Sequence, residues 1–452
     1  MNRDIITKVM FFLSCLLLVL TWGIHAGKYQ KFPHSVFVDV QAAMQELVHE
    51  WGTLTGAKPE HFLQPARYEG DGVTVNLTDR HDGSYVFLSG FFDDTNELRL
   101  IKRDGEIVAR WPVQYSTYVP DTSHLNEPPT TDWNVDLHGA LMEADGSVVF
   151  NFESSGLVKL DRCGKMEWVV KTASHHSVEP AREGGYWVPG TLFHARRTKS
   201  EFRPFVTPFV EDTIMHISAD GELLKEISVP GLFYSNGLEA LLTSSGHQFD
   251  AAMGWDGEIL HVNKIAELDE SLADQFPDFD AGDLVLSLRN LNMLMVVDPA
   301  TETVKWWRIG PWIRQHDPEF GPGGVIVLFN NNVYRTAFAA GRDVSWTTTA
   351  LSVPRISNIL SVNPTTDDVQ ILYGTRDGEE LLSVIRGKVD LTGQGGLLIT
   401  EFEAGRVIET DAEGNIVWEY INRFDEDEVA ELTEAKLYSP EYFDVTDWSC
   451  EQ

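Results

Sequence analysis

The amino-acid sequence predicts an all-β fold, a six-bladed β-propeller preceded by an N-terminal membrane anchor or signal helix. Two repeated strand patterns and one apolar N-terminal run lead to this prediction. The 20 prolines and 36 glycines are scattered along the chain, as expected for many short strands and turns. The hydrophobic fraction of 43% is ample for a packed core and argues against disorder.

The apolar run covers residues 9–24 and follows two basic residues, Arg3 and Lys8. It is short for a full membrane span and long for the core of a signal peptide. Because Ile24 occupies a position where signal cleavage prefers a small residue, we favour an uncleaved anchor over a cleaved signal. The basic end would then remain cytoplasmic, and the rest of the chain would face the periplasm or the exterior, or be exported.

We assign residues 1–30 to this anchor or signal, residues 31–66 to a helical linker and residues 67–448 to the propeller. Within the linker, residues 35–52 place apolar side chains at helical spacing, which predicts a short amphipathic helix. The acidic run at residues 424–435 is interpreted as a solvated helix face that packs beside the ring.

The first repeated pattern is a β-hairpin. Each copy has two arms of alternating apolar and polar residues, joined by a turn rich in Asp, Gly or Thr, and the second arm often ends in Trp or Tyr. The six copies lie at residues 98–111, 157–170, 214–227, 294–307, 359–373 and 407–420.

The second pattern is a short polar turn followed by an apolar strand, and it often begins with histidine. It precedes the hairpins at residues 79–90, 138–152, 176–190, 261–289, 316–331 and 390–405. Together the two patterns make a four-stranded blade, and six blades close into a ring without long exposed strand edges. The alternative architecture is a ring of seven or eight blades, with degenerate blades within residues 231–293.

Four histidines share one register within their repeat units: His138, His176, His261 and His316. The innermost strand of a blade lines the central channel, so residues at the start of these strands should converge on its mouth. Arginine and asparagine lie near them in sequence, at Asn263, Arg289 and Asn330. Such donors stabilise anionic charge, whereas a metal site usually adds a carboxylate ligand. We therefore expect an anion-transfer site without a metal or another cofactor.

The formal net charge of −34 argues against nucleic acid and anionic lipid surfaces as partners. An anion site in such a chain must be local and lie inside a cleft. Cys163 and Cys450 are far apart in sequence, and their spacing does not decide whether they pair. The chain has no C-x-x-C pair, which argues against a thiolate zinc site.

Several segments resemble the bacterial arylsulfate sulfotransferases. RQHDPEFGPGGVIVLFNNN (314–332) resembles the QHD and FDNG signature of that family, and LHVNKIAEL (260–268) with GDLVLSLRNLN (282–292) resembles its HxN and SxRH elements. HHSVEPAREGGYWVPG (175–190) resembles its HHD element, and residues 395–422 resemble its closing blade. The resemblance extends in order over residues 67–425.

The resemblance implies a periplasmic six-bladed propeller that moves a sulfuryl group from an aryl sulfate ester to a phenol, without the nucleotide donor PAPS. His316 would be the nucleophile and would be transiently sulfated. His261, Asn263 and Arg289 would hold the sulfuryl oxygens, and His176 would assist proton transfer at the phenolic oxygen. The further candidate substrate-binding residues are His138, His175 and Asn330.

Three positions depart from the family pattern. Lys264 stands where the family has a small hydroxyl residue, Asn290 where it usually has histidine, and Asn330 where it has a carboxylate. Two other functions therefore stay open from the sequence. One is a non-catalytic exported propeller that binds a ligand or a protein, and the other is a metal-dependent hydrolase or lyase that uses the histidines.

Overall fold

The computed structural model describes residues 3–28, 58–125, 128–129, 131–195, 202, 205–244, 255–332 and 357–450. The amphipathic helix predicted at residues 35–52 lies outside these residues. The described end of the expected linker forms a 3-10 helix, η1 (Glu60–Phe62), and a short strand, β1 (Leu63–Pro65). The chain divides into two units, one that contains the N-terminal helix and one that contains the strands.

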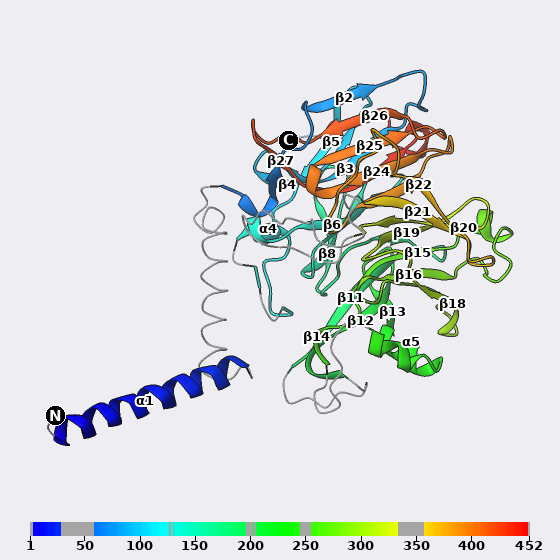
Figure 1. Cartoon of the computed structure of the whole chain (residues 1–452). Coiled ribbons are helices and arrows are strands. Elements are labelled where there is room, and N and C mark those ends of the chain that lie inside the picture. The colour runs from blue at the N-terminus through cyan, green and yellow to red at the C-terminus, as the bar shows by residue number, and fades with distance from the viewer. Residues whose placement is uncertain are drawn as a thin grey trace. The chain divides into compact units, whose positions relative to one another are not determined.

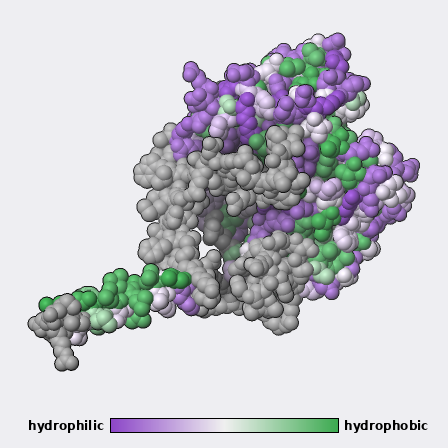
Figure 2. Space-filling view, in the orientation of Figure 1, coloured by the Kyte–Doolittle hydropathy of each residue, from purple (hydrophilic) through white to green (hydrophobic). Residues whose placement is uncertain are grey.

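The N-terminal unit contains helix α1 (Arg3–Lys28). Within it, the 20 residues Thr7–Ala26 have a mean hydropathy of 2.1, and only 6% of the most apolar stretch is buried. By length and composition this helix can cross a membrane, and the face seen in Figure 2 is mostly apolar. The helix is thus compatible with a signal or an anchor.

The second unit is a six-bladed β-propeller in which each blade contains a four-stranded antiparallel sheet (Figure 1). From the innermost strand outward, the first three blades are formed as follows: β28 (Leu432–Tyr438), β3 (Tyr85–Phe92), β4 (Thr95–Ile101) and β5 (Ile107–Pro112); β6 (Leu137–Met142), β7 (Val148–Phe152), β8 (Gly156–Leu160) and β9 (Met166–Val170); β10 (Glu179–Pro180), β11 (Tyr186–His194), β12 (Phe205–Ile217) and β13 (Leu223–Ser228).

The other three blades follow the same order along the chain. They are formed by β15 (Val262–Glu267), β16 (Leu284–Leu288), β17 (Met293–Asp298) and β18 (Thr303–Ile309); β19 (His316–Gly321), β20 (Val325–Asn330), β21 (Asn358–Val362) and β22 (Val369–Tyr373); β23 (Lys388–Leu391), β24 (Leu397–Glu401), β25 (Arg406–Thr410) and β26 (Ile416–Ile421). All six predicted hairpins are the outer strand pairs of these blades.

The two ends of the second unit close the ring. The C-terminal strand β28 is the innermost strand of the first blade, and the early strand β2 (Gly72–Asn76) pairs with β26 on the outside of the last blade. The prediction of a solvated helix at residues 424–435 is wrong, because this run contains β27 (Glu428–Ala430) and the start of β28. The run was predicted to be solvated because it is acidic. In the structure, however, Glu434 is buried and lies 3.2 Å from the Lys388 ammonium group.

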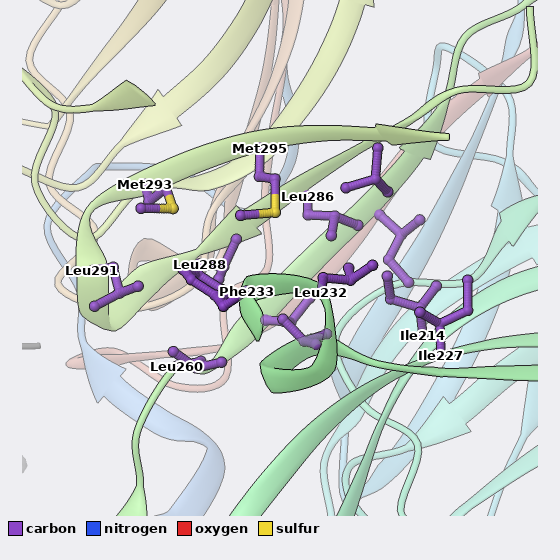
Figure 3. Close-up of a cluster of buried hydrophobic side chains, with 14 of the residues drawn as sticks. Ile214, Ile227, Leu232, Phe233, Leu260, Leu286, Leu288, Leu291, Met293 and Met295 are labelled. Carbon is purple, nitrogen blue, oxygen red and sulfur yellow. The ribbon is translucent and has the colours of Figure 1, made fainter. Parts of the chain in front are cut away.

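The described residues of 231–293, which are 231–244 and 255–293, form no additional blade, so the alternative of seven or eight blades is wrong. The segment contributes strands to the third and fourth blades, including β14 (Trp255–Glu258), which runs parallel to β12 as a fifth strand. Its short helix α5 (Val229–Ser235) covers the seam between these two blades. There Leu232 and Phe233 of α5 pack with Leu286 and Met295 of the fourth blade (Figure 3).

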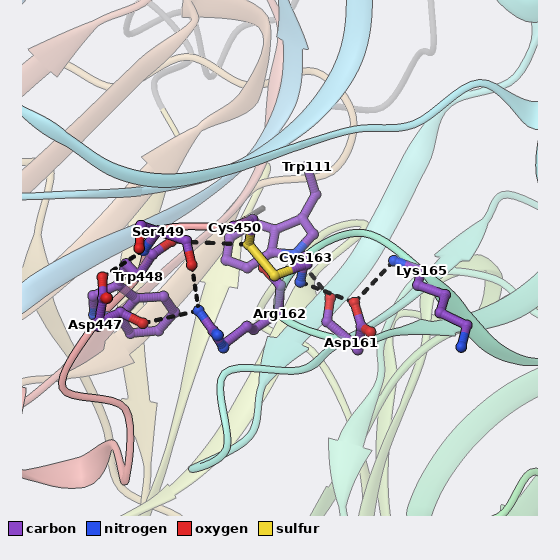
Figure 4. Close-up of a disulfide and its surroundings, with 9 residues drawn as sticks. All are labelled: Trp111, Asp161, Arg162, Cys163, Lys165, Asp447, Trp448, Ser449 and Cys450. Atoms are coloured by element: carbon purple, nitrogen blue, oxygen red, sulfur yellow. Dashed lines mark hydrogen bonds between the residues drawn. A yellow bond between two sulfur atoms is a disulfide. The ribbon is translucent and has the colours of Figure 1, made fainter. Parts of the chain in front are cut away.

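A disulfide fastens the C-terminal tail to the second blade. Cys163, in the turn between β8 and β9, is bonded to Cys450, and the two Cα atoms are 5.6 Å apart (Figure 4). The neighbouring Arg162 guanidinium donates to the carbonyls of Asp447 and Ser449 at 2.8 and 2.9 Å. The pairing that the sequence left undecided is therefore formed.

Candidate active site in the propeller funnel

The inner strands of the third to fifth blades begin at sharp backbone turns. His176 and His261 have φ values of +58° and +59°, and Arg314, two residues before His316, has +54°. Such conformations cost about 1–3 kcal/mol each in non-glycine residues and cluster at functional sites. At His261 the turn is held by the buried Asp212 carboxylate, which accepts hydrogen bonds from the backbone of His261 and Val262 at 3.1 and 2.8 Å.

Five buried imidazole rings lie together near the starts of the inner strands. The ring centre of His176 is 4.0 Å from that of His138, 4.7 Å from His261, 4.8 Å from His175 and 6.2 Å from His316. Gly139 permits the close approach of the second and third blades, since a Cβ atom there would lie 2.5 Å from the His176 carbonyl oxygen. The repeat register that placed the histidines in equivalent positions thus corresponds to one cluster.

The environment of this cluster favours neutral imidazoles. Burial lowers the pKa of His138, His176 and His316 well below 6.5, and it lowers the pKa of His175 to about 3. Burial and then the Arg289 guanidinium also lower the pKa of His261. A neutral ring has one nitrogen with a lone pair, so each ring can act as an acceptor or a nucleophile at neutral pH.

His316 is held in a single tautomer. Its Nδ1 atom lies 2.7 Å from Asn331 Oδ1 and 3.0 Å from the Arg314 carbonyl oxygen, and both are acceptors. The Asn331 amide cannot flip, because its Nδ2 donates to the carbonyls of Ser383 and Arg386. Nδ1 therefore carries the proton, and the buried Nε2 atom keeps a lone pair and has no hydrogen-bond partner among the described residues.

Two arginines flank His316. Arg289 begins the 3-10 helix η4 (Arg289–Leu291), and its backbone N–H donates to the His261 carbonyl at 3.0 Å. The Arg314 backbone N–H donates to Asn292 Oδ1 at 2.7 Å, and its buried Nε has no hydrogen-bond partner among the residues that the structure describes. Burial and repulsion by Arg314 lower the pKa of Arg289 to about 10. An anion bound between these guanidinium groups would relieve both effects.

Carboxylates also reach the cluster, contrary to the expectation from the sequence. Glu258 Oε1 lies 2.6 Å from His261 Nδ1, and Glu153 Oε1 lies 3.7 Å from His138 Nδ1. His138, Glu153 and His176 each place a ligand atom within 4.8 Å of the others, a spacing that suits a divalent cation. The Arg386 guanidinium contacts Glu153 as well as Asp136, and a metal ion would compete with it.

The two asparagines singled out from the sequence have other partners. Asn263 Nδ2 donates to the Gln315 carbonyl at 2.8 Å and so supports the backbone before His316. Asn330 Oδ1 accepts from the Ile313 backbone N–H, and its Nδ2 donates to Asn358 Oδ1. Both polar groups of Asn330 are thus engaged within its own blade.

Lys264 and Asn290, which depart from the family pattern, are both accommodated. The Lys264 ammonium group is buried and lies 2.7, 3.1 and 2.5 Å from carboxylate oxygens of Glu179, Asp317 and Glu319. Asn290 Nδ2 donates to the Glu258 carbonyl, and its Oδ1 accepts from Arg289 Nε at 3.4 Å. Neither substitution removes a contact of the His316 ring.

The lysine belongs to a larger ion network below the histidines. Lys388 joins Asp317 to Glu434 at 3.3 and 3.2 Å, and Lys436 lies 3.5 Å from Glu179. The members of this network lie on or next to the innermost strands of five blades, β10, β15, β19, β23 and β28. The network therefore links the inner strands of five blades, including the strands β15 and β19 that carry or follow His261 and His316.

Four residues of the site were not selected from the sequence: Asn331, Arg314, Glu153 and Glu258. Asn331 and Arg314 lie in the segment that resembles the family signature, and Asn331 occupies the amide position of the FDNG motif. Glu258 has no signal in the sequence, because it ends β14, a strand that the repeat does not predict.

The fold and the site define a class of protein, a six-bladed propeller in which neutral imidazoles and arginines gather at the inner strands. The family model for arylsulfotransferase (ASST) matches residues 139–423, and the chain belongs to this family. No curated protein matches the chain significantly.

Two solved structures illustrate the similarity, both at low sequence identity. A protein of unknown function from Bacteroides caccae is 12% identical, with a TM-score of 0.43, and the match covers 75% of this chain and 94% of that one. A catalytically inactive virginiamycin B lyase from Staphylococcus aureus with quinupristin is 10% identical, with a TM-score of 0.38 and coverages of 79% and 87%.

Proposed function

We propose that the protein transfers a sulfuryl group from an aryl sulfate ester to a phenolic acceptor through a sulfohistidine at His316. The observation that carries the proposal is the His316 Nε2 atom, which has a lone pair, is buried and has no hydrogen-bond partner among the described residues. The family supplies the reaction class, and the two arginines beside His316 supply positive charge where sulfuryl oxygens would lie.

In the first half-reaction, Nε2 of His316 attacks the sulfur atom. The N–S bond forms as the S–O bond to the aryl group breaks, and the phenolate leaves with the electron pair. The ring becomes cationic, so its Nδ1–H donates more strongly to Asn331 Oδ1 and the Arg314 carbonyl. Arg289 and Arg314 stabilise the charge on the sulfuryl oxygens, a contribution of about 3–4 kcal/mol for one such donor.

In the second half-reaction, the acceptor oxygen attacks the sulfur of sulfated His316. The O–S bond forms, the S–N bond breaks, and its electron pair returns to Nε2. The acceptor hydroxyl loses its proton to a base in the histidine cluster. We propose His175 and His176 for this proton transfer, His261 and Asn263 for holding the reacting groups, and His138 for binding the aryl substrate.

Steady-state kinetics with 4-nitrophenyl sulfate as donor and phenol as acceptor test the proposal. Parallel lines in double-reciprocal plots are expected, together with complete loss of transfer in His316→Ala. Retention of transfer in that variant would overturn the role of His316. His81→Ala is the matched control, because His81 forms a hydrogen bond with Asn76 in a different part of the propeller.

A metal-dependent hydrolase or lyase is the second candidate function, favoured by the spacing of His138, Glu153 and His176. Elemental analysis of the purified full-length chain separates the two candidates. One equivalent of a divalent metal that is lost in Glu153→Gln, with loss of activity, would favour the metal-dependent reaction. Transfer from 4-nitrophenyl sulfate that is unaffected by chelators and by Glu153→Gln would favour sulfuryl transfer.

We also propose that helix α1 anchors the chain and that the propeller faces the periplasm or the exterior. The Cys163–Cys450 disulfide supports this orientation, because disulfides persist mainly in oxidising compartments. Cleavage by an added protease in intact cells, with protection of the N-terminus, is the expected result. A propeller that is protected until the membrane is permeabilised would contradict it.

A further inference from the structure

Glu258, His261, His176 and His175 form a continuous series of short polar contacts. Glu258 Oε1 lies 2.6 Å from His261 Nδ1, His261 Nε2 lies 3.1 Å from His176 Nε2, and His176 Nδ1 lies 2.7 Å from His175 Nδ1. The series begins at a carboxylate that is 41% exposed and ends at His175 Nε2, which is buried and has no hydrogen-bond partner among the described residues.

The positions of the protons follow from the contacts. A carboxylate only accepts, and a contact between two imidazole nitrogens needs one N–H and one lone pair. The Glu258–His261 contact is short but lacks the angle of a hydrogen bond. We assign the proton of His261 to Nδ1, toward the ionised carboxylate. The two contacts between ring nitrogens then place the proton of His176 on Nε2 and that of His175 on Nδ1. The lone pair at the end of the series is then on His175 Nε2.

Electrostatics agree with this order. The neighbouring His261 and Arg289 lower the pKa of Glu258 to about 2 against the effect of its burial, which keeps this carboxylate ionised. The groups that face the series include the Arg289 and Arg314 guanidinium groups, the Glu153 carboxylate, which lies within 4.8 Å of His176, and Asp212, whose pKa burial raises to about 7. The two cations disfavour positive charge on His261 and so favour the movement of a proton from this ring to Glu258.

We propose that Glu258 is a positioning residue at the outer end of a proton path through His261 and His176 to His175. The inference rests on the proposed sulfuryl transfer and deepens it. When the acceptor hydroxyl is sulfated, its proton goes to His175 Nε2. The Nδ1 proton of His175 passes to His176 Nδ1, the Nε2 proton of His176 to His261 Nε2, and the Nδ1 proton of His261 to Glu258, which releases it to solvent.

This path answers a difficulty with His176. Both of its ring nitrogens are occupied, by His175 and His261. In this arrangement it cannot take a proton directly from a phenol. As the middle member of a path it assists proton transfer without contacting the phenolic oxygen.

The test compares the two half-reactions in Glu258→Gln. The glutamine oxygen can still accept from His261 Nδ1, but the side chain cannot take up the proton. We expect the burst of 4-nitrophenolate that accompanies sulfation of His316 to stay within about 3-fold of wild type, since this leaving group needs no proton. Transfer from sulfated His316 to phenol should slow by about 10- to 100-fold. Glu106→Gln, which changes an exposed carboxylate paired with Lys102, is the matched control.

The outcomes are distinguishable. Equal loss in both half-reactions would mean that Glu258 only maintains the pocket, and unchanged transfer to phenol would remove it from the reaction; either result overturns the path. If wild type gives no burst, the sulfuryl-transfer function itself fails.

Nitrogen-15 NMR of the full-length chain reports the tautomers independently of turnover. An Nε2–H tautomer is expected at His176, and Nδ1–H tautomers are expected at His175 and His261. The opposite tautomer at His261 would contradict the path.

Discussion

The Nδ1 atom of His316 lies 2.7 Å from the side-chain oxygen of Asn331, whose own amide nitrogen is held by two backbone carbonyls. This relationship fixes the tautomer of the ring and leaves Nε2 with a lone pair. The proposed reaction depends on it more than on any other single contact.

Replacing Asn331 by alanine should lower the rate of His316 sulfation. The ring would lose one of its two Nδ1 acceptors, and the Ser383 and Arg386 carbonyls would lose a donor. We expect the burst rate with 4-nitrophenyl sulfate to fall by about 10²-fold and the free energy of unfolding to fall by about 1–3 kcal/mol. A folded variant with a wild-type burst would contradict the role assigned to Asn331.

Replacing Arg314 by methionine should separate activity from stability. The guanidinium is partly buried, its Nε has no partner among the described residues, and it repels Arg289. We expect the transfer rate to fall at least about 10-fold, while the free energy of unfolding in urea stays level or rises by up to about 1 kcal/mol. A variant that loses stability and keeps its rate would show that Arg314 is structural.

The pH dependence of kcat/KM should reflect the unusually low pKa of His316. A protonated ring is not a nucleophile, and burial together with Arg289 holds this pKa well below 6.5. The rate should therefore stay level as the pH falls through 6.5 and decline only in more acidic solution. In Arg289→Met the pKa rises because a cation is removed, so the acid limb should move to higher pH.

Arg308→Met is the matched control for that profile, since Arg308 pairs with the exposed Asp367. An acid limb at pH 6.5 in wild type would show that the titrating ring is not buried. An acid limb that does not move in Arg289→Met would show that Arg289 does not face His316.

Replacing Lys264 by methionine should strongly destabilise the propeller. The substitution leaves Glu179, Asp317 and Glu319 without their shared cation in a buried network. Removing one partner of such a group costs about 3–5 kcal/mol, which urea unfolding would measure. Adding Glu319→Gln should restore part of the loss, since burial already raises the pKa of Glu319 to about 8. Lys102→Met, at an exposed pair, should change little; equal loss in both lysine variants would contradict the account.

Replacing both Cys163 and Cys450 by serine should lower stability without altering transfer. The bond joins residues 287 positions apart, and closing long loops stabilises proteins by about 2–5 kcal/mol. Thermal unfolding with and without a reductant should show the loss in wild type and no effect of reductant in the double variant. Loss of transfer in the folded double variant would mean that the tail also acts on the site.

The sequence was sufficient for the blades because their signals are local. Alternating apolar residues and turn chemistry within one hairpin predict the outer strand pairs, and the histidines share a register with the repeat. Strand β28 was misread because its partners, β3 and Lys388, lie far away in sequence. The local amino-acid sequence around a buried carboxylate on an inner strand does not differ from that around a solvated carboxylate.

The site was predictable only where a residue shares the register or a motif. Asn330 and Asn331 are adjacent and chemically identical. Only the structure shows that Asn330 accepts a hydrogen bond from the Ile313 backbone, whereas Asn331 forms one with His316. Glu258 reaches His261 because β14 runs parallel to β12, a pairing outside the repeat. Contacts of this kind arise from tertiary structure and leave no pattern in the sequence.

The central claim is that His316 carries the sulfuryl group between donor and acceptor. Rapid acid- or base-quench mass spectrometry after mixing with an aryl sulfate, without acceptor, tests it most directly. We predict one added SO₃ group on the peptide that contains His316, its disappearance when phenol is added, and no adduct in His316→Ala. An adduct on another residue, or turnover through an unmodified His316, would contradict the account.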